Sequence, residues 1–185
     1  MKEEHQKLID QYEKNEKTIE KSVIKIIVLE VLMIGIVLYM KSIQDTASLK
    51  ANIIATSIVT ALLCLYFLDF YPRRGRYKSL ADTVLEGVNL ENRYPFLNPQ
   101  FFKNYLKEFN TVGYIVKMMI FDLFFIYFFS ASYTQLLKAI HPETLVKLKT
   151  ITPVTTWVIT FSIGWAYYKA IQPLSRFKKE LEAKG

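Results

Sequence analysis

The chain has 185 residues, of which 51% are hydrophobic, 15% aromatic and 22% charged. A chain this polar on average is not uniformly immersed in lipid, so its charges must be segregated from its apolar stretches. The single cysteine, Cys64, excludes a disulfide framework and a dithiol redox pair within the chain. The formal net charge of +7 favours contact with anionic lipid headgroups over specific nucleic-acid binding, for which no groove-reading motif is present.

Residues 1–22 form a polar N-terminal segment in which acids precede bases by four residues. The pairs are Glu3 with Lys7, Asp10 with Lys14, and Glu13 with Lys17. This spacing predicts an exposed cytoplasmic helix that runs into the apolar residues beyond it. A heptad-like seam follows the same helix and either assembles an oligomer or belongs to a solvated extension; its residues are Ile9, Tyr12, Ile19, Val23 and Ile26.

Four windows of 18 to 21 residues are nearly free of charge: Val23–Met40, Ala51–Phe70, Gly113–Tyr133 and Thr150–Ala170. As helices, they are each about long enough to cross a hydrocarbon layer of about 30 Å. They are too long and too continuous for the strands of a membrane barrel. We therefore predict an all-α integral membrane protein with four transmembrane helices and short cytoplasmic helices.

The distribution of basic residues predicts the orientation of these spans. Sixteen of the 24 Lys and Arg residues lie in the two terminal tails and the central segment, five in the short loops 41–50 and 134–149, and three in the spans. The positive-inside rule then places both termini and the central segment in the cytoplasm. The predicted divisions are 1–22, a first hairpin over 23–70, a cytoplasmic segment over 71–112, a second hairpin over 113–170, and a tail over 171–185.

Two of the spans carry a lysine followed five residues later by an acid, Lys25 with Glu30 and Lys117 with Asp122. The lysines lie close enough to the cytoplasmic boundary to reach the headgroups, whereas the acids lie about 7.5 Å deeper along the axis. Five residues turn a helix by about 140°, so each acid needs a partner other than its own lysine. The candidates are threonines, water, or the matching acid of the other half or of another subunit. The acids belong either to a pathway or to a structural hydrogen bond between helices.

The first span aligns with the third without a gap when Lys25 is placed on Lys117, and the second span aligns with the fourth at an offset of 100 residues. The match suggests a tandem duplication of a helical hairpin, with convergence on a membrane composition as the alternative. Thr56, Thr60 and Cys64 match Thr156, Thr160 and Gly164, and each trio follows one helix face. Such faces serve close helix packing or a polar pathway.

Charges also match at the cytoplasmic ends of the second and fourth spans, where Asp69 aligns with Lys169. Asp69 either forms a charge latch with Lys25, Lys117 or Lys169, or remains a solvated boundary charge.

The central segment 71–112 is the largest cytoplasmic surface that the sequence predicts. Pro72 is expected to end the second span, and a basic run follows at the headgroups. Asn98 and Pro99 are expected to form the cap and first turn of a helix that enters the third span. The segment either lies flat on the membrane, with an aromatic stripe over 101–109, or docks a soluble cytoplasmic partner. The residues expected to contact lipid headgroups or that partner are Arg73, Arg74, Arg76, Lys78, Leu80, Val84, Leu85 and Val88.

Motifs for catalysis or cofactor binding are not found in the sequence. In the predicted topology His5 and His141 lie on opposite sides of the membrane and cannot share a metal ion. No phosphate-binding glycine loop, metal-binding helix or nucleophile elbow occurs. We expect no cofactor, no metal and no enzymatic activity.

These features predict a homo-oligomeric sensor, effector or anchoring subunit of a bacterial inner membrane that engages a cytoplasmic partner. The layout is also that of several bacterial immunity and phage-defence membrane proteins, so defence is one example of such a role, although no shared motif supports it. Richness in Lys, Ile, Asn, Tyr and Phe points to a bacterial source. The alternative is a small ion or proton channel that uses the mid-membrane acids.

Overall fold

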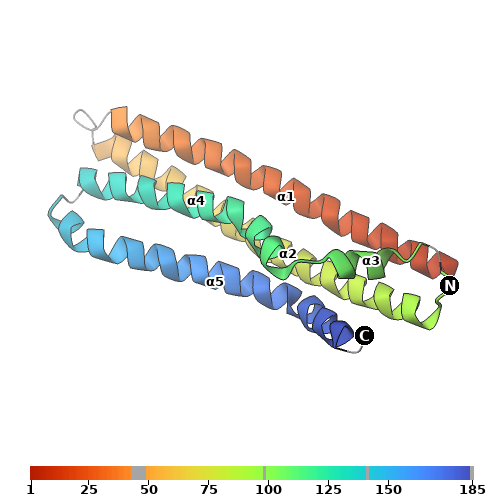
Figure 1. Ribbon diagram of the computed structural model, residues 1–185. Coiled ribbons are helices and arrows are strands. Elements are labelled where there is room, and N and C mark those ends of the chain that lie inside the picture. The colour runs from red at the N-terminus through yellow and green to blue at the C-terminus, as the bar shows by residue number, and fades with distance from the viewer. Residues whose placement is uncertain (43–48, 98, 141, 184–185) are drawn as a thin grey trace. The chain divides into compact units, whose positions relative to one another are not determined.

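The computed structural model describes residues 1–42, 49–97, 99–140 and 142–183; within these, side chains are not described at 40, 41, 49, 50, 52, 53, 56, 135–140 and 142–152. The described ranges hold five helices and no strand, which confirms the predicted all-α class (Figure 1). The helices are α1 (Lys2–Ser42), α2 (Leu49–Arg93), α3 (Phe101–Glu108), α4 (Thr111–Ile140) and α5 (Pro142–Glu182).

Two of the described helical stretches are long and apolar enough to cross a membrane, Lys2–Tyr39 and Thr111–Thr134. They contain nearly all of the first predicted window and the whole of the third. The other two windows, 51–70 and 150–170, include residues whose side chains are not described. Length and composition therefore identify two candidate spans in this structure.

The chain divides into two compact units. Unit 1 comprises Met1–Ser22, Tyr71–Met118 and Trp165–Gly185, and unit 2 comprises Val23–Phe70 and Met119–Gly164. Each of the four long helices contributes to both units. The helix α2 continues through Pro72 without a break, so the proline does not end it. Pro72 is exposed, and α2 accommodates the ring and the missing backbone donor without interruption.

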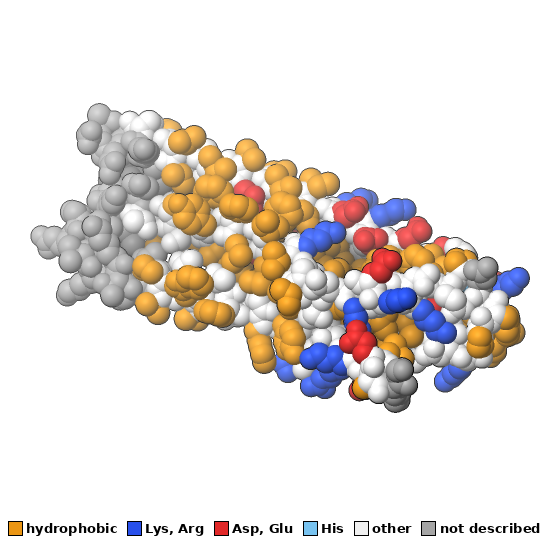
Figure 2. Space-filling view, viewed as in Figure 1, with side chains coloured by type: hydrophobic (Ala, Val, Ile, Leu, Met, Phe, Trp, Pro, Cys, Tyr) orange, Lys and Arg blue, Asp and Glu red, His pale blue; other side chains and the backbone are white. Residues whose placement is uncertain are grey.

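Unit 2 presents apolar side chains outward on all four of its helices. On the face of the molecule that Figure 2 shows, hydrophobic side chains form a broad surface. On α1 and α2 they recur at helical spacing, which makes each helix apolar on its outer face as well as its inner one. Exposed members include Ile24, Val28, Val31 and Leu38 on α1, Ile54, Ile58, Leu65 and Leu68 on α2, Ile120, Phe124 and Tyr127 on α4, and Val154, Trp157 and Phe161 on α5.

The α1 seam is used inside the chain. Tyr12 and Ile19 are buried in unit 1, and Ile26 is buried in unit 2. The sequence offered two alternatives for this seam, an oligomer contact or a solvated extension. Neither describes these three residues, because other parts of the same chain cover them. Two of the predicted surface ion pairs are present, Glu3 with Lys7 at 3.7 Å and Glu13 with Lys17 at 3.8 Å.

The aromatic stripe of 101–109 packs against α1 within unit 1. The Tyr12 ring meets the Phe101 ring at 5.5 Å and the Tyr105 ring at 5.4 Å, both edge to face. Phe102 and Phe109 are buried. Burial raises the pKa of the Tyr12 and Tyr105 hydroxyls, which keeps them neutral among these rings. The stripe is therefore part of a protein core, and the expectation that it lies flat on a membrane is wrong.

Half of the predicted docking residues are also buried. Leu80, Val84, Val88 and Arg73 are each at most 1% exposed, so they build the interior of unit 1. The helical spacing of these residues therefore identifies a face of α2 that is buried within the chain. The helices α1 and α3 both contact this part of α2. Leu85 is half-buried, and Arg74 and Lys78 are exposed.

The ends of α3 and α4 are fixed by side chains. Lys178 donates from Nζ to the carbonyl oxygens of Lys107 and Phe109, at 2.9 and 2.6 Å, which satisfies one carbonyl in the last turn of α3 and that of its C-cap residue. Asn110 Oδ1 accepts from the backbone N–H groups of Val112 and Gly113, at 3.1 Å each, and so caps α4. These two caps separate α3 from α4, where a single helix entering the third span was expected. That expectation started the helix at Asn98, which lies outside the described residues.

A substitution at Gly87 tests how closely α3 packs against α2. A Cβ atom at this position would overlap the ring of Phe102, which is fully buried and has no room to turn away. We expect Gly87→Ala to lower the free energy of unfolding by about 1 to 3 kcal/mol, as other overpacked cores do. Thermal unfolding followed by circular dichroism measures this change.

Gly75→Ala is the matched control, because a Cβ atom there meets nothing within 4 Å. In an exposed helix this change should stabilise by about 0.5 to 1 kcal/mol. Equal unfolding temperatures for the two variants would contradict the close contact between Gly87 and Phe102.

Candidate functional site

Asp122 of α4 is the most deeply buried of the described acids in unit 2. It is 0% exposed, and the hydroxyl of Tyr66 on α2 donates to its Oδ1 at 2.5 Å. The Tyr66 ring stacks on Phe125 with centroids 4.3 Å apart, which fixes the direction of its hydroxyl. Tyr66 was not among the predicted partners of this acid. A phenol bonded to a buried acid joins α2 to α4 and satisfies polar groups that would otherwise be costly to bury.

Glu30 of α1 belongs to the same cluster. Its carboxyl group is close enough to Asp122 for the two charges to interact. Its Oε1 atom is buried and has no hydrogen-bond partner among the described residues. One of the predicted partners of each acid was the matching acid of the other hairpin. The structure brings Glu30 and Asp122 together in this way, within one chain.

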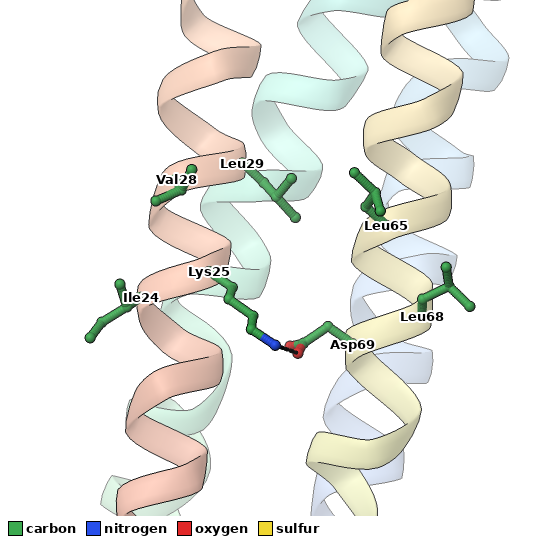
Figure 3. A pocket seen from close by; sticks show the side chains of 7 residues that line it. All are labelled: Ile24, Lys25, Val28, Leu29, Leu65, Leu68 and Asp69. Carbon is green, nitrogen blue, oxygen red and sulfur yellow. Dashed lines mark ion pairs between the residues drawn. The ribbon is translucent and has the colours of Figure 1, made fainter.

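The charged boundary pair of unit 2 joins α1 to α2. Lys25 Nζ lies 3.8 Å from Asp69 Oδ1, and the two side chains point toward each other across a groove between the helices (Figure 3). The Lys25 side chain is 70% exposed and that of Asp69 is 15% exposed. The groove measures about 440 Å³, and its remaining lining is apolar: Ile24, Val28, Leu29, Leu65 and Leu68. A pair this exposed contributes about 0 to 1 kcal/mol in water.

The described threonines of the two stripes differ in burial. Thr156 Oγ1 donates to Ser130 Oγ at 3.3 Å, linking α5 to α4. Thr60 is exposed, Thr160 is half-buried, and the side chain of Thr56 lies outside the described part. At the end of the same α5 face, a Cβ atom on Gly164 would lie 3.0 Å from Met119, so this position serves close packing.

A second polar cluster, which the sequence did not reveal, lies in unit 1. Glu91 near the end of α2 is 0% exposed and lies 2.8 Å from His5 Nε2. Its two carboxylate oxygens also accept from the backbone N–H groups of Phe102 and Lys103, at 3.0 and 2.9 Å. These groups belong to the first turn of α3, where the helix dipole favours a negative charge. One carboxylate thus ties together α1, α2 and α3.

An open groove lies beside this cluster on unit 1, with a volume of about 440 Å³. The start of α1 forms one wall and the second half of α2 forms the other. Three carboxylates, one guanidinium, one amide and three leucines line it: Glu4, Asp82, Glu86, Arg93, Asn89, Leu8, Leu85 and Leu90. An apolar floor with a net negative rim is suited to a basic amphipathic segment.

The remaining predicted residues lie at the surface. Arg74, Lys78 and Lys169 line one pocket of unit 1, Lys117 is exposed and Arg76 is half-buried. Across the described ranges no three His, Cys, Asp or Glu side chains are grouped so as to hold a metal ion. His141 lies outside those ranges.

Comparisons with known proteins return no match among protein-family models, curated proteins or solved structures. Any functional inference therefore rests on the residues and geometry of this chain.

The Tyr66 hydroxyl offers a test of the buried cluster of unit 2. Tyr66→Phe removes the hydroxyl that donates to Asp122 while keeping the stacked ring, so we expect a loss of about 1 to 3 kcal/mol in the free energy of unfolding. Thermal unfolding in a mild detergent measures it. Tyr127→Phe is the control, because Tyr127 is exposed on α4. If both variants unfold at the wild-type temperature, the Tyr66 hydrogen bond does not hold the helices together.

Proposed function

We propose that this chain is a non-enzymatic, four-helix protein of a bacterial inner membrane that engages a cytoplasmic partner through unit 1. The observation that carries the membrane assignment is the apolar outer surface of unit 2, which includes α2 and α5 as well as the two candidate spans. Only 22% of the residues in each candidate window are buried, whereas the core helix of a soluble protein is mostly covered. All four helices of this unit expose apolar side chains on their outer faces, and such faces are stable in lipid rather than in water.

The groove of unit 1 supports the second half of the proposal. It lies largely within the segment 71–112, and its acidic rim and leucine floor match a partner segment that is basic and amphipathic. The chain thus serves as a sensor, effector or anchoring subunit rather than as a catalyst. Assembly into a homo-oligomer stays part of the proposal, although Asp122 no longer requires a second copy to supply its hydrogen bond.

Inside-out membrane vesicles from producing cells test both halves in one experiment. We expect the protein to resist alkaline extraction, and a fluorescent basic amphipathic peptide to bind to inside-out but not to right-side-out vesicles. Asp82→Lys with Glu86→Lys should weaken peptide binding by roughly tenfold or more, because it reverses two charges of the rim.

Glu108→Lys with Glu180→Lys is the control, since it adds the same charge at exposed positions of unit 1 outside the groove. Protein-free vesicles give the background of peptide bound to lipid alone. Release by alkali would overturn the membrane assignment. Equal loss of binding in the two double variants would instead overturn the groove as the docking site.

A second candidate function, an ion or proton pathway, is favoured by the proximity of Glu30 and Asp122. Flux of protons and potassium from liposomes tests it, with wild type beside Glu30→Gln and Asp122→Asn. A pathway requires that wild type conducts and that either substitution stops the flux. Under the first proposal nothing conducts and the substitutions change only stability, because the acids then join helices.

A further inference from the structure

Three basic side chains from two helices converge on one pocket of unit 1. Arg74 and Lys78 lie one turn apart on α2, and Lys169 comes from α5. The pocket measures about 300 Å³, and Tyr71, Gly75 and Ala170 complete its lining. The sequence predicts Arg74 and Lys78 at the headgroups and Lys169 in a separate latch, whereas the structure brings the three side chains together in one pocket.

No carboxylate is among the residues that line this pocket. Within the described part of the chain, none of its three cations forms an ion pair. Four other lysines of the chain each lie within 4.0 Å of a carboxylate: Lys7, Lys17, Lys25 and Lys178. Like charges held together without an acid repel one another, and an anion bound among them would remove that repulsion.

The position of the pocket along the chain indicates what that anion is. Tyr71 follows directly on the apolar window 51–70, and Lys169 and Ala170 end the window 150–170. Aromatic side chains gather at the same level: Tyr71 is 69% exposed, and Lys169 Nζ lies 5.1 Å from the centre of the Trp165 ring. Exposed tyrosine and tryptophan beside cations are typical of the headgroup layer of a membrane.

We propose that this pocket binds the phosphate of an anionic phospholipid headgroup. The Arg74 guanidinium is suited to bidentate contact with phosphate oxygens, and the two ammonium groups supply point charges around them. The inference rests on the proposed membrane location. Resistance to alkaline extraction reports that location independently, so the two can fail separately.

Tryptophan fluorescence provides the measurement. The chain has two tryptophans, and Trp157→Phe leaves Trp165, next to Lys169, as the single reporter. The purified full chain in a neutral detergent is titrated with short-chain phosphatidylglycerol, with phosphatidylcholine of the same chain length, and with inorganic phosphate. We expect saturable binding of phosphatidylglycerol and at least tenfold weaker binding of the other two. Arg74→Gln with Lys78→Gln should raise the Kd for phosphatidylglycerol roughly 25-fold, about fivefold for each cation removed.

Lys2→Gln with Lys14→Gln is the control, because it removes the same charge from exposed positions of α1. It should change the Kd less than twofold, and all variants should keep the wild-type unfolding temperature. Equal weakening by the control would show attraction to net charge alone and overturn the site. Inorganic phosphate that binds as tightly as phosphatidylglycerol would make it a site for a free anion, and equally tight phosphatidylcholine would exclude recognition of charge; each result overturns the proposal.

Discussion

The carboxylate of Glu91 is the interaction on which the architecture of unit 1 depends. A buried carboxylate is costly unless it is fully hydrogen-bonded, and Glu91 meets this requirement through His5 and the first turn of α3. The start of α1 and the whole of α3 are therefore fixed to the end of α2 by one side chain. The acidic groove is built from the neighbours of these residues, since Glu4 and Leu8 flank His5 and Leu90 precedes Glu91. Its two walls keep their spacing because His5 and Glu91 hold them.

The helices of unit 2 are joined by polar pairs that include Tyr66 with Asp122 and Thr156 with Ser130. Apolar side chains cover the outside of this unit. In lipid, apolar burial drives helix association only weakly, so such pairs and close contacts like that of Gly164 with Met119 supply the specificity. The Glu30 carboxyl near Asp122 is the one feature that exceeds what packing requires, which is why a pathway remains the second candidate.

The sequence predicted those features that depend on local spacing. The helical class, the continuity of the first helix with its apolar window, and the ion pairs of Glu3 with Lys7 and Glu13 with Lys17 all follow from residues three or four apart. Local spacing did not reveal what covers an apolar face. Leu80, Val84 and Val88 have the periodicity of a docking surface and also that of a buried one, and only the position of α1 and α3 distinguishes the two.

The missed partners were remote in sequence. Tyr66 lies 56 residues from Asp122, and His5 lies 86 residues from Glu91. No local motif marks either pair, because a tyrosine in an apolar window and a glutamate near a helix end are both ordinary. The α3 boundaries were missed for a similar reason: Lys178, which caps α3, comes from the end of α5.

The two proposed sites of unit 1 lie on one uninterrupted stretch of α2, and their charges link them. Arg74 and Lys78 face the pocket, and Asp82 and Glu86 follow at the same four-residue spacing on the rim of the groove. The midpoints of the two pairs are about 12 Å apart along the axis, which is about one and a half times the screening length of physiological salt. Without salt, a pair of unit charges at that separation interacts by about 0.3 kcal/mol in water and about 1.4 kcal/mol at a protein surface, and salt reduces both energies.

An anionic headgroup in the pocket would therefore favour a basic partner in the groove, whereas an empty pocket would repel it through three cations. The coupling is reciprocal, so a docked partner would also tighten the hold on the lipid. A membrane protein with this arrangement can report the charge of its leaflet to a cytoplasmic partner without any movement of its helices.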